Sequence, residues 1–324
     1  MNFKSLIAGV GVLFSVWLFP AASGWAEGKK IYLSQSAGGA NFLSAHIADK
    51  KGFFKSEGLD LERVVVRASN ISIAGMLAGD IDYAILFSAV ARAAMRGLPV
   101  RLILLIMERP DYDLVSRPEI TRIEQLNGKT MAVNTIGAAA DVVTRLILER
   151  SGLVPDRDVR LLPIASTVAR KTALEKGWAA AALVSLLDSH SLEQQGYRIL
   201  IKAADLPLFP FMGVGTTVKK IQDRPDEVKG LIKAFLRVNR FLREERAQMV
   251  PLIMEWAQME RENAERYYQT VWPLYSANGE PRDTDMKLVI DLAKKDLGMK
   301  GEIPVSQVAN FRLLRVARRE LGIR

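Results

Sequence analysis

The chain has 324 residues, a formal net charge of +9 and no cysteine. Its 45 lysines and arginines are spread through every segment, whereas nucleic-acid-binding proteins gather basic and aromatic residues together, so we expect no nucleic-acid partner. Without cysteine the fold cannot depend on disulfides. A mature chain of about 300 residues can bury roughly three quarters of its unfolded surface and is expected to divide into two lobes.

The first 26 residues have the pattern of a cleaved secretion signal. Lys4 is the only charged residue before Glu27, an apolar run covers 6–19, and Pro20 ends that run ahead of small residues. The run is shorter than the roughly 20 residues that a membrane-spanning helix needs. No cysteine follows it that could carry a lipid anchor. We therefore expect residues 1–26 to be removed and the mature protein to be exported.

From residue 30 to residue 215, apolar runs that predict strands alternate with amphipathic segments that predict helices. This alternation is typical of α/β layers with mostly parallel sheets. The predicted strands cover residues 31–33, 61–66, 84–87, 102–107, 131–133, 159–163, 181–184 and 199–201. After residue 215 the chain becomes almost entirely helical. Helices are predicted from Pro225 and near 249–258, 263–271, 283–297 and 305–321.

Two short segments each end a helix at glycine and pass directly into a strand. In residues 48–61, Gly52 ends the helix ahead of a phenylalanine pair, and Gly58 precedes the strand. In residues 76–84, Gly79 likewise ends the helix. The pair resembles the "GFF…EGL" and "L-x-x-G-x-x-D-x-A" segments of the type II periplasmic solute-binding proteins of ABC importers. The resemblance is to the nitrate-, sulfonate- and taurine-binding (NMT1/THI5-like) group.

The resemblance continues in the second half of the strand–helix region. Residues 123–133 look like the "L-x-G-K-x-V-A-V" segment that begins the second domain of that family, with methionine and alanine in place of the usual first pair. Residues 151–159 match the "GL-x-x-x-x-x-V" turn after that domain's first helix. The matched segments together extend from about residue 30 to residue 214.

The resemblance implies an α/β, two-lobed periplasmic binding protein type II fold, with a helical C-terminal extension packed on the first lobe. Applied here, lobe 1 would comprise residues 30–111 and 218–324, and lobe 2 would comprise residues 112–217. A small-molecule ligand would lie in the cleft between the lobes and be delivered to an ABC permease in the inner membrane. The resemblance further implies a periplasmic location, a monomer and no cofactor.

Two crossings between the lobes would act as the hinge. We expect them near residues 112–116 and 210–215. Gly213 and Gly215 are candidate pivots for closure, although close packing in a strand would explain the same glycines.

The candidate ligand contacts follow the predicted strands, because strand carboxyl ends face the crevice of open α/β sheets and helix N-termini there present free N–H groups. In the first lobe the candidates are Gln35, Ser36, Gly38, Gly39, Ser69, Asn70 and Ser88. In the second lobe they are Thr135, Gly137, Ala138, Ser166, Thr167 and Ser185. Several of these residues also have a simpler explanation: Gly38 and Gly39 could form a tight turn, and Ser69, Asn70 and Ser88 could cap helices.

The sequence departs from the family pattern at two places in the second lobe. Family members often carry Gly-Ser or Gly-Thr where this chain has Gly137 and Ala138, so Thr135 would have to supply the missing hydroxyl. The family's "G-x-V-D-A" is replaced at residues 177–181, which removes an acid.

Side chains near the rim of the predicted cleft that could reach inward are Arg67, Arg109, Arg117, Phe42, Tyr112 and Phe209. A polar, uncharged or aromatic solute is therefore as credible as a sulfonate.

The inventory of catalytic groups is small. His46 and His190 are the only histidines, and no metal-ligand, nucleophile-elbow or phosphate-loop motif is present, so we expect no metal and no enzymatic activity. Two alternatives stay open. The first is an enzyme of the same fold from thiamine-pyrimidine or menaquinone biosynthesis, and the second is a ligand-sensing subunit for a membrane kinase.

Overall fold

The structure is a computed structural model that describes residues 30–35, 40–66, 68–202, 205 and 209–323. The expected secretion signal, the candidates Ser36, Gly38 and Gly39, Arg67 and the side chain of Phe42 lie outside this description. Among the described residues, we find no helix that has both the length and the apolar composition needed to cross a membrane.

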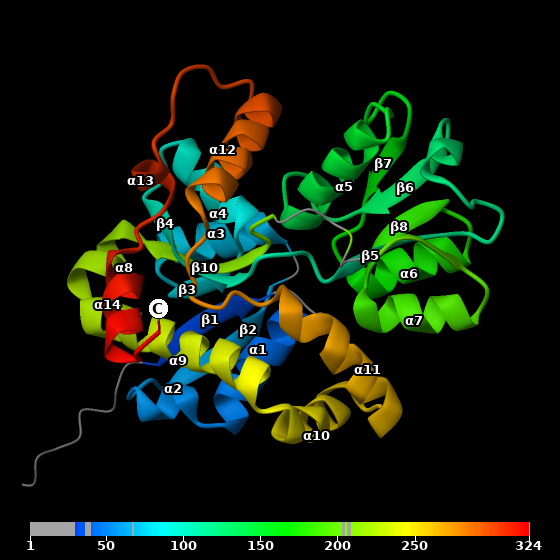
Figure 1. Cartoon of the computed structure of the whole chain (residues 1–324). Helices are drawn as coiled ribbons and strands as arrows, with labels where there is room; N and C mark the ends of the chain where they lie inside the picture. Colours follow the sequence, from blue (N-terminus) through cyan, green and yellow to red (C-terminus); the bar gives the residue numbers. More distant parts are fainter. Residues whose placement is uncertain (1–29, 36–39, 67, 203–204, 206–208, 324) are drawn as a thin grey trace, which may run out of the picture.

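Two five-stranded sheets form the centres of two lobes (Figure 1). The first sheet has the order β2 (Leu61–Val65), β1 (Ile31–Gln35), β3 (Tyr83–Ile85), β10 (Met212–Thr217) and β4 (Val100–Met107). The second has the order β7 (Arg160–Pro163), β6 (Thr130–Val133), β8 (Ala181–Ser185), β5 (Tyr112–Ser116) and β9 (Arg198–Ile201). In each sheet one strand, β10 or β5, runs antiparallel to its neighbours. The predicted strands and the mostly parallel sheets are confirmed.

Helices cover both faces of these sheets (Figure 1). Those of the strand–helix region are α1 (Ala40–Lys50), α2 (Phe53–Ser56), α3 (Ser69–Ala78), α4 (Ser88–Met95), α5 (Ala139–Arg150), α6 (Thr167–Glu175) and α7 (Leu186–Gln194). The C-terminal helices are α8 (Val218–Asp223), α9 (Pro225–Glu244), α10 (Arg246–Ala257), α11 (Arg261–Val271), α12 (Asp283–Leu297), α13 (Val305–Val308) and α14 (Arg312–Glu320). The predicted helical C-terminal region is confirmed.

The single helix predicted over residues 305–321 is wrong, because the chain forms two helices there. Ala309 makes a parallel bridge with Leu102 of β4, and the amide of Asn310 donates a 2.8 Å hydrogen bond to the Leu102 carbonyl. The chain is therefore extended between α13 and α14, where it runs along the edge of the first sheet.

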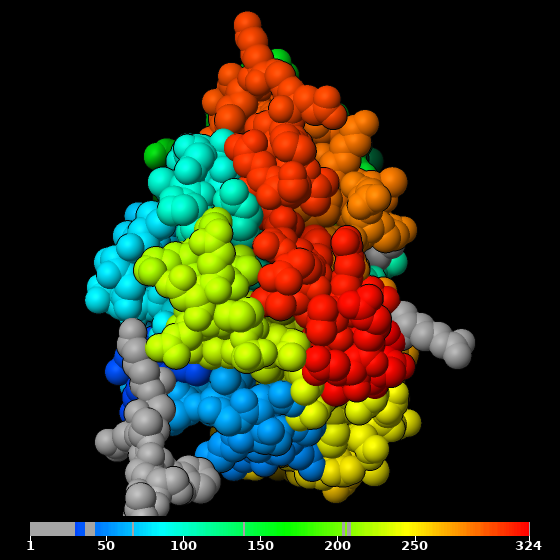
Figure 2. All heavy atoms as spheres, turned by 90° about the vertical axis from the view of Figure 1, so that its left-hand side faces the viewer, coloured from blue at the N-terminus to red at the C-terminus, as the bar shows by residue number. Residues whose placement is uncertain are grey.

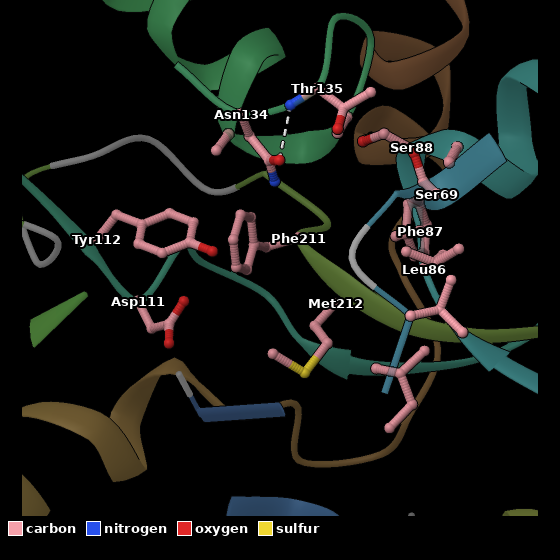
Figure 3. A pocket seen from close by; sticks show the side chains of 15 residues that line it. Ser69, Leu86, Phe87, Ser88, Asp111, Tyr112, Asn134, Thr135, Phe211 and Met212 are labelled. Carbon is pink, nitrogen blue, oxygen red and sulfur yellow. Dashed lines mark hydrogen bonds between the residues drawn. The ribbon is translucent and has the colours of Figure 1, made fainter. Parts of the chain in front are cut away.

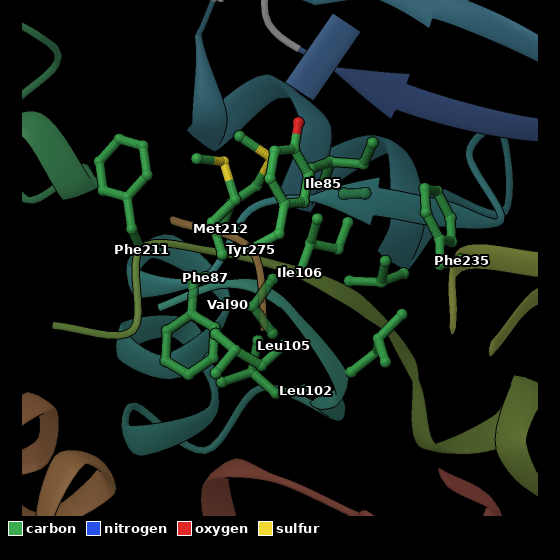
Figure 4. Close-up of a cluster of buried hydrophobic side chains, with 14 of the residues drawn as sticks. Ile85, Phe87, Val90, Leu102, Leu105, Ile106, Phe211, Met212, Phe235 and Tyr275 are labelled. Atoms are coloured by element: carbon green, nitrogen blue, oxygen red, sulfur yellow. The ribbon is translucent and has the colours of Figure 1, made fainter. Parts of the chain in front are cut away.

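The C-terminal helices pack on the first lobe: α12 and α13 contact α4, and Figure 2 shows the orange and red segments beside the cyan one. The apolar stripe of α9 is buried, with Leu231, Ile232 and Phe235 fully covered. Phe235 reaches the cluster of Figure 4, whose members include Leu102 and Ile106 of β4. This core extends to Phe211 and Met212, where the chain enters the first sheet, so it supports the start of β10.

The crossings between the lobes precede the segments that the sequence places at the hinge. The first crossing comprises residues 108–111, because β4 ends at Met107 and β5 begins at Tyr112. The second lies between β9 and β10; its described residues are Lys202, Asp205 and 209–211, so it overlaps the predicted segment only at residues 210–211. Residues 112–116 are a strand of the second sheet. Residues 212–217 are a strand of the first sheet, although the sequence-based division assigns them to lobe 2.

Gly213 and Gly215 lie inside β10, where neighbouring atoms leave no room for a side chain. A Cβ on Gly213 would lie 2.4 Å from the carbonyl oxygen of Leu104 and 2.7 Å from the Phe87 ring. A Cβ on Gly215 would lie 2.5 Å from the side chain of Val90. Close packing, rather than a pivot, therefore accounts for both glycines.

We expect Gly213→Ala to lower the free energy of unfolding by about 1–3 kcal/mol, because the Leu104 carbonyl belongs to the sheet and cannot move aside. The control is Gly230→Ala in α9, where the new Cβ would lie 3.3 Å from Glu57 Cβ, a tight contact that a shift of a few tenths of an ångström relieves. There alanine gains up to about 1 kcal/mol in helix propensity. Urea unfolding of both variants measures the difference, and equal stability of the two would contradict the packing argument.

Candidate functional site

A cavity of about 70 Å³ lies between the two lobes, at the carboxyl ends of their strands (Figure 3). The first lobe lines it with Val66, Ser69, residues 85–89 and Met212. The second lobe and the crossings line it with Asp111, Tyr112, Asn134, Thr135, Ala138, Ala140 and Phe211. Both lobes therefore contribute polar side chains to one small space.

The structure brings four of the sequence-predicted candidates together in this cavity, namely Ser69, Ser88, Thr135 and Ala138. The others lie elsewhere. Asn70 is exposed, and Gly137 packs against Arg92 of the first lobe. Gln35, Ser166, Thr167 and Ser185 do not line the cavity.

The serines divide into two groups by their hydrogen bonds. Ser166 and Ser185 are helix caps, whose hydroxyls accept from the amides of Ala169 at 3.4 Å and Asp188 at 3.3 Å. Ser69 and Ser88 are not caps, because the cap positions of α3 and α4 are occupied by the residues before them and carry no side-chain bond. The capping role expected for Ser69 and Ser88 is therefore wrong.

Two buried polar side chains on the first lobe lack partners within the described part of the chain. Ser88 is 3% exposed, and its Oγ, which faces the cavity, has no hydrogen-bond partner there. Gln35, at the carboxyl end of β1, is 2% exposed, and neither amide atom is bonded to a described residue. Because an unsatisfied buried polar group costs about 1–3 kcal/mol, the Ser88 hydroxyl favours a polar occupant of the cavity, whereas Gln35 does not line it.

The loop before α5 forms the part of the wall that comes from the second lobe. The Thr135 amide donates to Asn134 Oδ1 at 2.6 Å, as the dashed line in Figure 3 shows. The Gly137 amide donates to Asp141 Oδ2 at 2.8 Å, and Gly137 has a φ of 77°. A Cβ on Gly137 would lie 2.7 Å from Arg92 Nε of the opposite lobe. Glycine is needed here because the backbone conformation is left-handed and the two lobes approach closely.

An aromatic pair stands where the two crossings meet. The rings of Tyr112 and Phe211 are 5.3 Å apart between centroids and nearly perpendicular, at 88°. Burial, together with the nearby Asp111 carboxylate, raises the pKa of Tyr112 to about 12, although Arg170 opposes this shift. The phenol is therefore protonated at neutral pH.

Arg170 lies behind Tyr112 and is fully buried. Its guanidinium donates to the Leu183 carbonyl at 2.8 Å, to two carbonyls of the loop after β7 and to Thr167 Oγ1. Burial lowers the pKa of Arg170. The sequence analysis missed this residue, although Arg170 shares a helical face with the buried Ala173 and Leu174. Arg170 thus ties together the ends of β7 and β8 beside the cavity.

Neither histidine lines the cavity. His46 lies on α1, where burial and the charge of Arg63 lower its pKa. His190 on α7 has its Nε2 3.4 Å from Arg266 Nη1 of α11. No group of three or more histidine, aspartate or glutamate side chains in the described part of the chain is placed to hold a metal ion.

A larger groove of about 720 Å³ lies between α7 and α11. Its lining includes Leu187, Ile199 and Tyr267, together with His190. We place the candidate site in the smaller cavity because strand carboxyl ends and two helix N-termini converge there, whereas the groove is formed mainly by helix faces.

We expect Arg170→Met to lower the free energy of unfolding by about 3 kcal/mol or more, because several buried carbonyls lose their donor. The matched control is Arg117→Met. Arg117 is 42% exposed in its side chain and pairs with Glu119, so its loss should cost about 1 kcal/mol or less. Chemical denaturation measures both changes, and similar losses in the two variants would show that the buried bonds contribute little.

Known proteins resemble this chain in sequence and in fold. The NMT1/THI5 like family model matches residues 40–246. YtlA of Bacillus subtilis (strain 168), a relative named as a binding protein, is 21% identical over 226 residues, which cover 67% of this chain and 68% of YtlA.

Two solved structures are similar over most of their length. The periplasmic nitrate-binding protein NrtA from Synechocystis PCC 6803 has a TM-score of 0.76 at 14% identity, covering 91% of this chain and 89% of NrtA. The alkanesulfonate-binding protein SsuA from Xanthomonas axonopodis pv. citri, bound to MOPS, has a TM-score of 0.70 at 15% identity, covering 89% of this chain and 97% of SsuA. The expected two-lobed periplasmic binding protein fold is confirmed, and the chain belongs to the NMT1/THI5-like family.

Proposed function

We propose that this protein is an exported, periplasmic receptor that captures a small organic or anionic solute between its lobes and delivers it to an ABC permease. The observation that carries the proposal is the cavity at the strand ends, which both lobes line with polar side chains. The buried, unpartnered hydroxyl of Ser88 adds support, because it gains a partner when a polar solute binds.

The proposed mechanism is closure of the two lobes about the crossings that connect them. A solute that touches Ser69 and Ser88 on one lobe and Thr135 on the other interacts fully with the protein when the lobes are together. Such a solute has different affinities for the open and the closed arrangement, so binding shifts the population toward closure. The names of NrtA and SsuA, a nitrate-binding and an alkanesulfonate-binding protein, support a receptor for solutes of this kind.

The size of the cavity favours a small solute. Its volume of about 70 Å³ is roughly half of the 150 Å³ that accommodates benzene in an engineered protein cavity. By volume, nitrate, a short sulfonate or a related acid therefore suits the cavity better than a pyrimidine ring.

The enzyme alternative needs a general base or a nucleophile at the cavity. The titratable side chains that line it are Asp111 and Tyr112, and the pKa of Tyr112 is raised to about 12. The Tyr112 phenol stays protonated and is a hydrogen-bond donor rather than a base at neutral pH, and no histidine among the described residues lines the cavity to act with the Asp111 carboxylate. This arrangement suits binding, and we propose that the protein is not an enzyme.

Thermal-shift measurements test the receptor function against a panel of nitrate, sulfonates, taurine, carboxylates, aromatic acids and pyrimidines. A solute at 100 times its dissociation constant adds about 2.7 kcal/mol of stability and raises the melting temperature by several degrees. We expect one chemical class to produce this shift. A well-folded protein that responds to no member of the panel would contradict the receptor function.

We expect the double variant Ser69→Ala/Thr135→Ala to lose most of the solute-induced shift, because one hydrogen-bonding group is removed from each lobe. Ser166→Ala is the control, since Ser166 caps α6 outside the cavity. That variant should lose about 1 kcal/mol of intrinsic stability and keep the full shift. A double variant that responds like the unchanged protein would show that the solute binds elsewhere.

A further inference from the structure

A cavity of about 480 Å³ lies on the first lobe alone, between β4, α8 and the segment that contains α13 and α14. Figure 2 looks onto this side of the molecule, where the yellow-green segment of α8 lies beside the red C-terminal segment. None of the residues that line it also lines the cavity between the lobes. The chemistry of this second cavity is therefore independent of the proposed solute site.

Three arginines line this second cavity, namely Arg101, Arg312 and Arg315, and we call it the arginine groove. Arg101 belongs to β4, whereas Arg312 and Arg315 lie near the start of α14. No aspartate or glutamate is among the described residues that line the groove. Since like charges gathered in one cleft add their fields, the groove has a positive potential.

One of the three charges is partly compensated by a carboxylate outside the groove. Glu280 accepts a hydrogen bond from Arg315 at 2.7 Å and another from Arg318 at 2.9 Å. A single carboxylate is thus shared by two arginines. This group of three side chains keeps a net positive charge beside the groove.

The other two charges have no such partner. Arg101 donates to the carbonyl of Val100 at 2.8 Å, and neither Arg101 nor Arg312 pairs with a carboxylate in the part of the chain that the structure describes. The first turn of α14 contains no acidic residue either. Positive charge at a helix N-terminus is disfavoured by the helix dipole. The protein therefore keeps two uncompensated guanidinium groups where an anion would relieve their repulsion.

The rest of the lining can hold an organic group. Ile221 of α8 and Phe311 before α14 are 5% and 8% exposed and provide an apolar wall. Gln222 and Ser306 add side chains that can donate hydrogen bonds. The volume is within the range of about 300–1,000 Å³ that is usual for small-molecule sites. An apolar wall beside two cations suits an organic acid better than an inorganic ion.

We propose that the arginine groove binds a soluble phosphate monoester that carries an apolar group. A phosphate monoester has nearly two negative charges at neutral pH and three strong acceptor oxygens. It therefore matches the charges of Arg101 and Arg312 together, and each guanidinium can bind two oxygens at once. A sulfonate or a carboxylate has one charge and compensates only one of the two. The apolar group packs against Ile221 and Phe311.

Calorimetric titration of the purified protein with phenyl phosphate, benzenesulfonate and inorganic phosphate tests the proposal. Benzenesulfonate keeps the ring with a single charge, and inorganic phosphate keeps the acid group without the ring. We expect phenyl phosphate to bind about tenfold or more tightly than either, because it alone uses both guanidinium groups and the apolar wall. Undetectable binding of phenyl phosphate, or equal binding of all three compounds, overturns the proposal.

Arg312→Gln assigns the binding to the groove, because glutamine keeps a polar side chain and removes the charge. We expect it to weaken phenyl phosphate binding about tenfold to a hundredfold, the range of a hydrogen bond between charged groups. Arg319→Gln is the control, since Arg319 is exposed on the same helix and lies outside the groove. That variant should bind phenyl phosphate almost as the unchanged protein does. Equal effects of the two substitutions overturn the proposal.

Two further measurements identify other binding modes. The Ser69→Ala/Thr135→Ala variant should keep phenyl phosphate binding; if it does not, the compound binds between the lobes, the groove proposal is wrong and the receptor function stands. Vesicles of phosphatidic acid, compared with vesicles of phosphatidylcholine, test a membrane surface as the occupant. Sedimentation with the acidic vesicles that depends on Arg312, without binding of phenyl phosphate, would show that the groove contacts lipid headgroups and that a soluble ligand is wrong.

Discussion

The position of the cavity depends on the hydrogen bonds between the two crossings. The amide of Phe209 donates to the Glu108 carbonyl at 3.0 Å, and the amide of Phe211 donates to the Met107 carbonyl at the same distance. Next to these bonds, the Phe211 ring packs edge-on against Tyr112. Residues 107–108 are therefore paired with residues 209–211 between the sheets, and this pairing holds the carboxyl ends of both sets of strands toward a common space.

The sequence predicts the strands and the C-terminal helices well, because each depends on a local pattern of apolar residues and on glycine or proline at the ends. It places the crossings less well. The residues on either side of each crossing belong to apolar strands that form similar local patterns, so the sequence does not show to which sheet each strand belongs. The strand at Tyr112 and the packed glycine at Gly213 thus resemble hinge segments. Similarly, no local signal shows that Asn310 would bond to β4 and interrupt the last helix.

The candidate site was only partly predictable for a related reason. Ser88 and Ser185 both follow a strand and precede a helix, so the sequence treats them alike. Tertiary structure separates them, since Ser185 bonds to Asp188 while the Ser88 hydroxyl is directed into the space between the lobes. The sequence analysis did not include Asp111 and Arg170 among the site residues, because charged residues are normally expected at the solvated surface. Their burial results from packing between segments that are distant in the sequence.

Two of the contacts between the lobes outside the crossings lie at the surface of the described part of the chain. Lys295 of α12 pairs with Glu149 of α5 at 2.7 Å, with side chains 64% and 37% exposed, and His190 meets Arg266 on the other side of the molecule. An exposed ion pair such as that of Lys295 with Glu149 contributes about 0–1 kcal/mol, and the contact between the basic side chains of His190 and Arg266 is not an ion pair. A solute that makes several hydrogen bonds worth about 0.5–1.5 kcal/mol each contributes more than these contacts do. In the proposed receptor, a solute bound between the lobes would therefore favour closure more than these two surface contacts do.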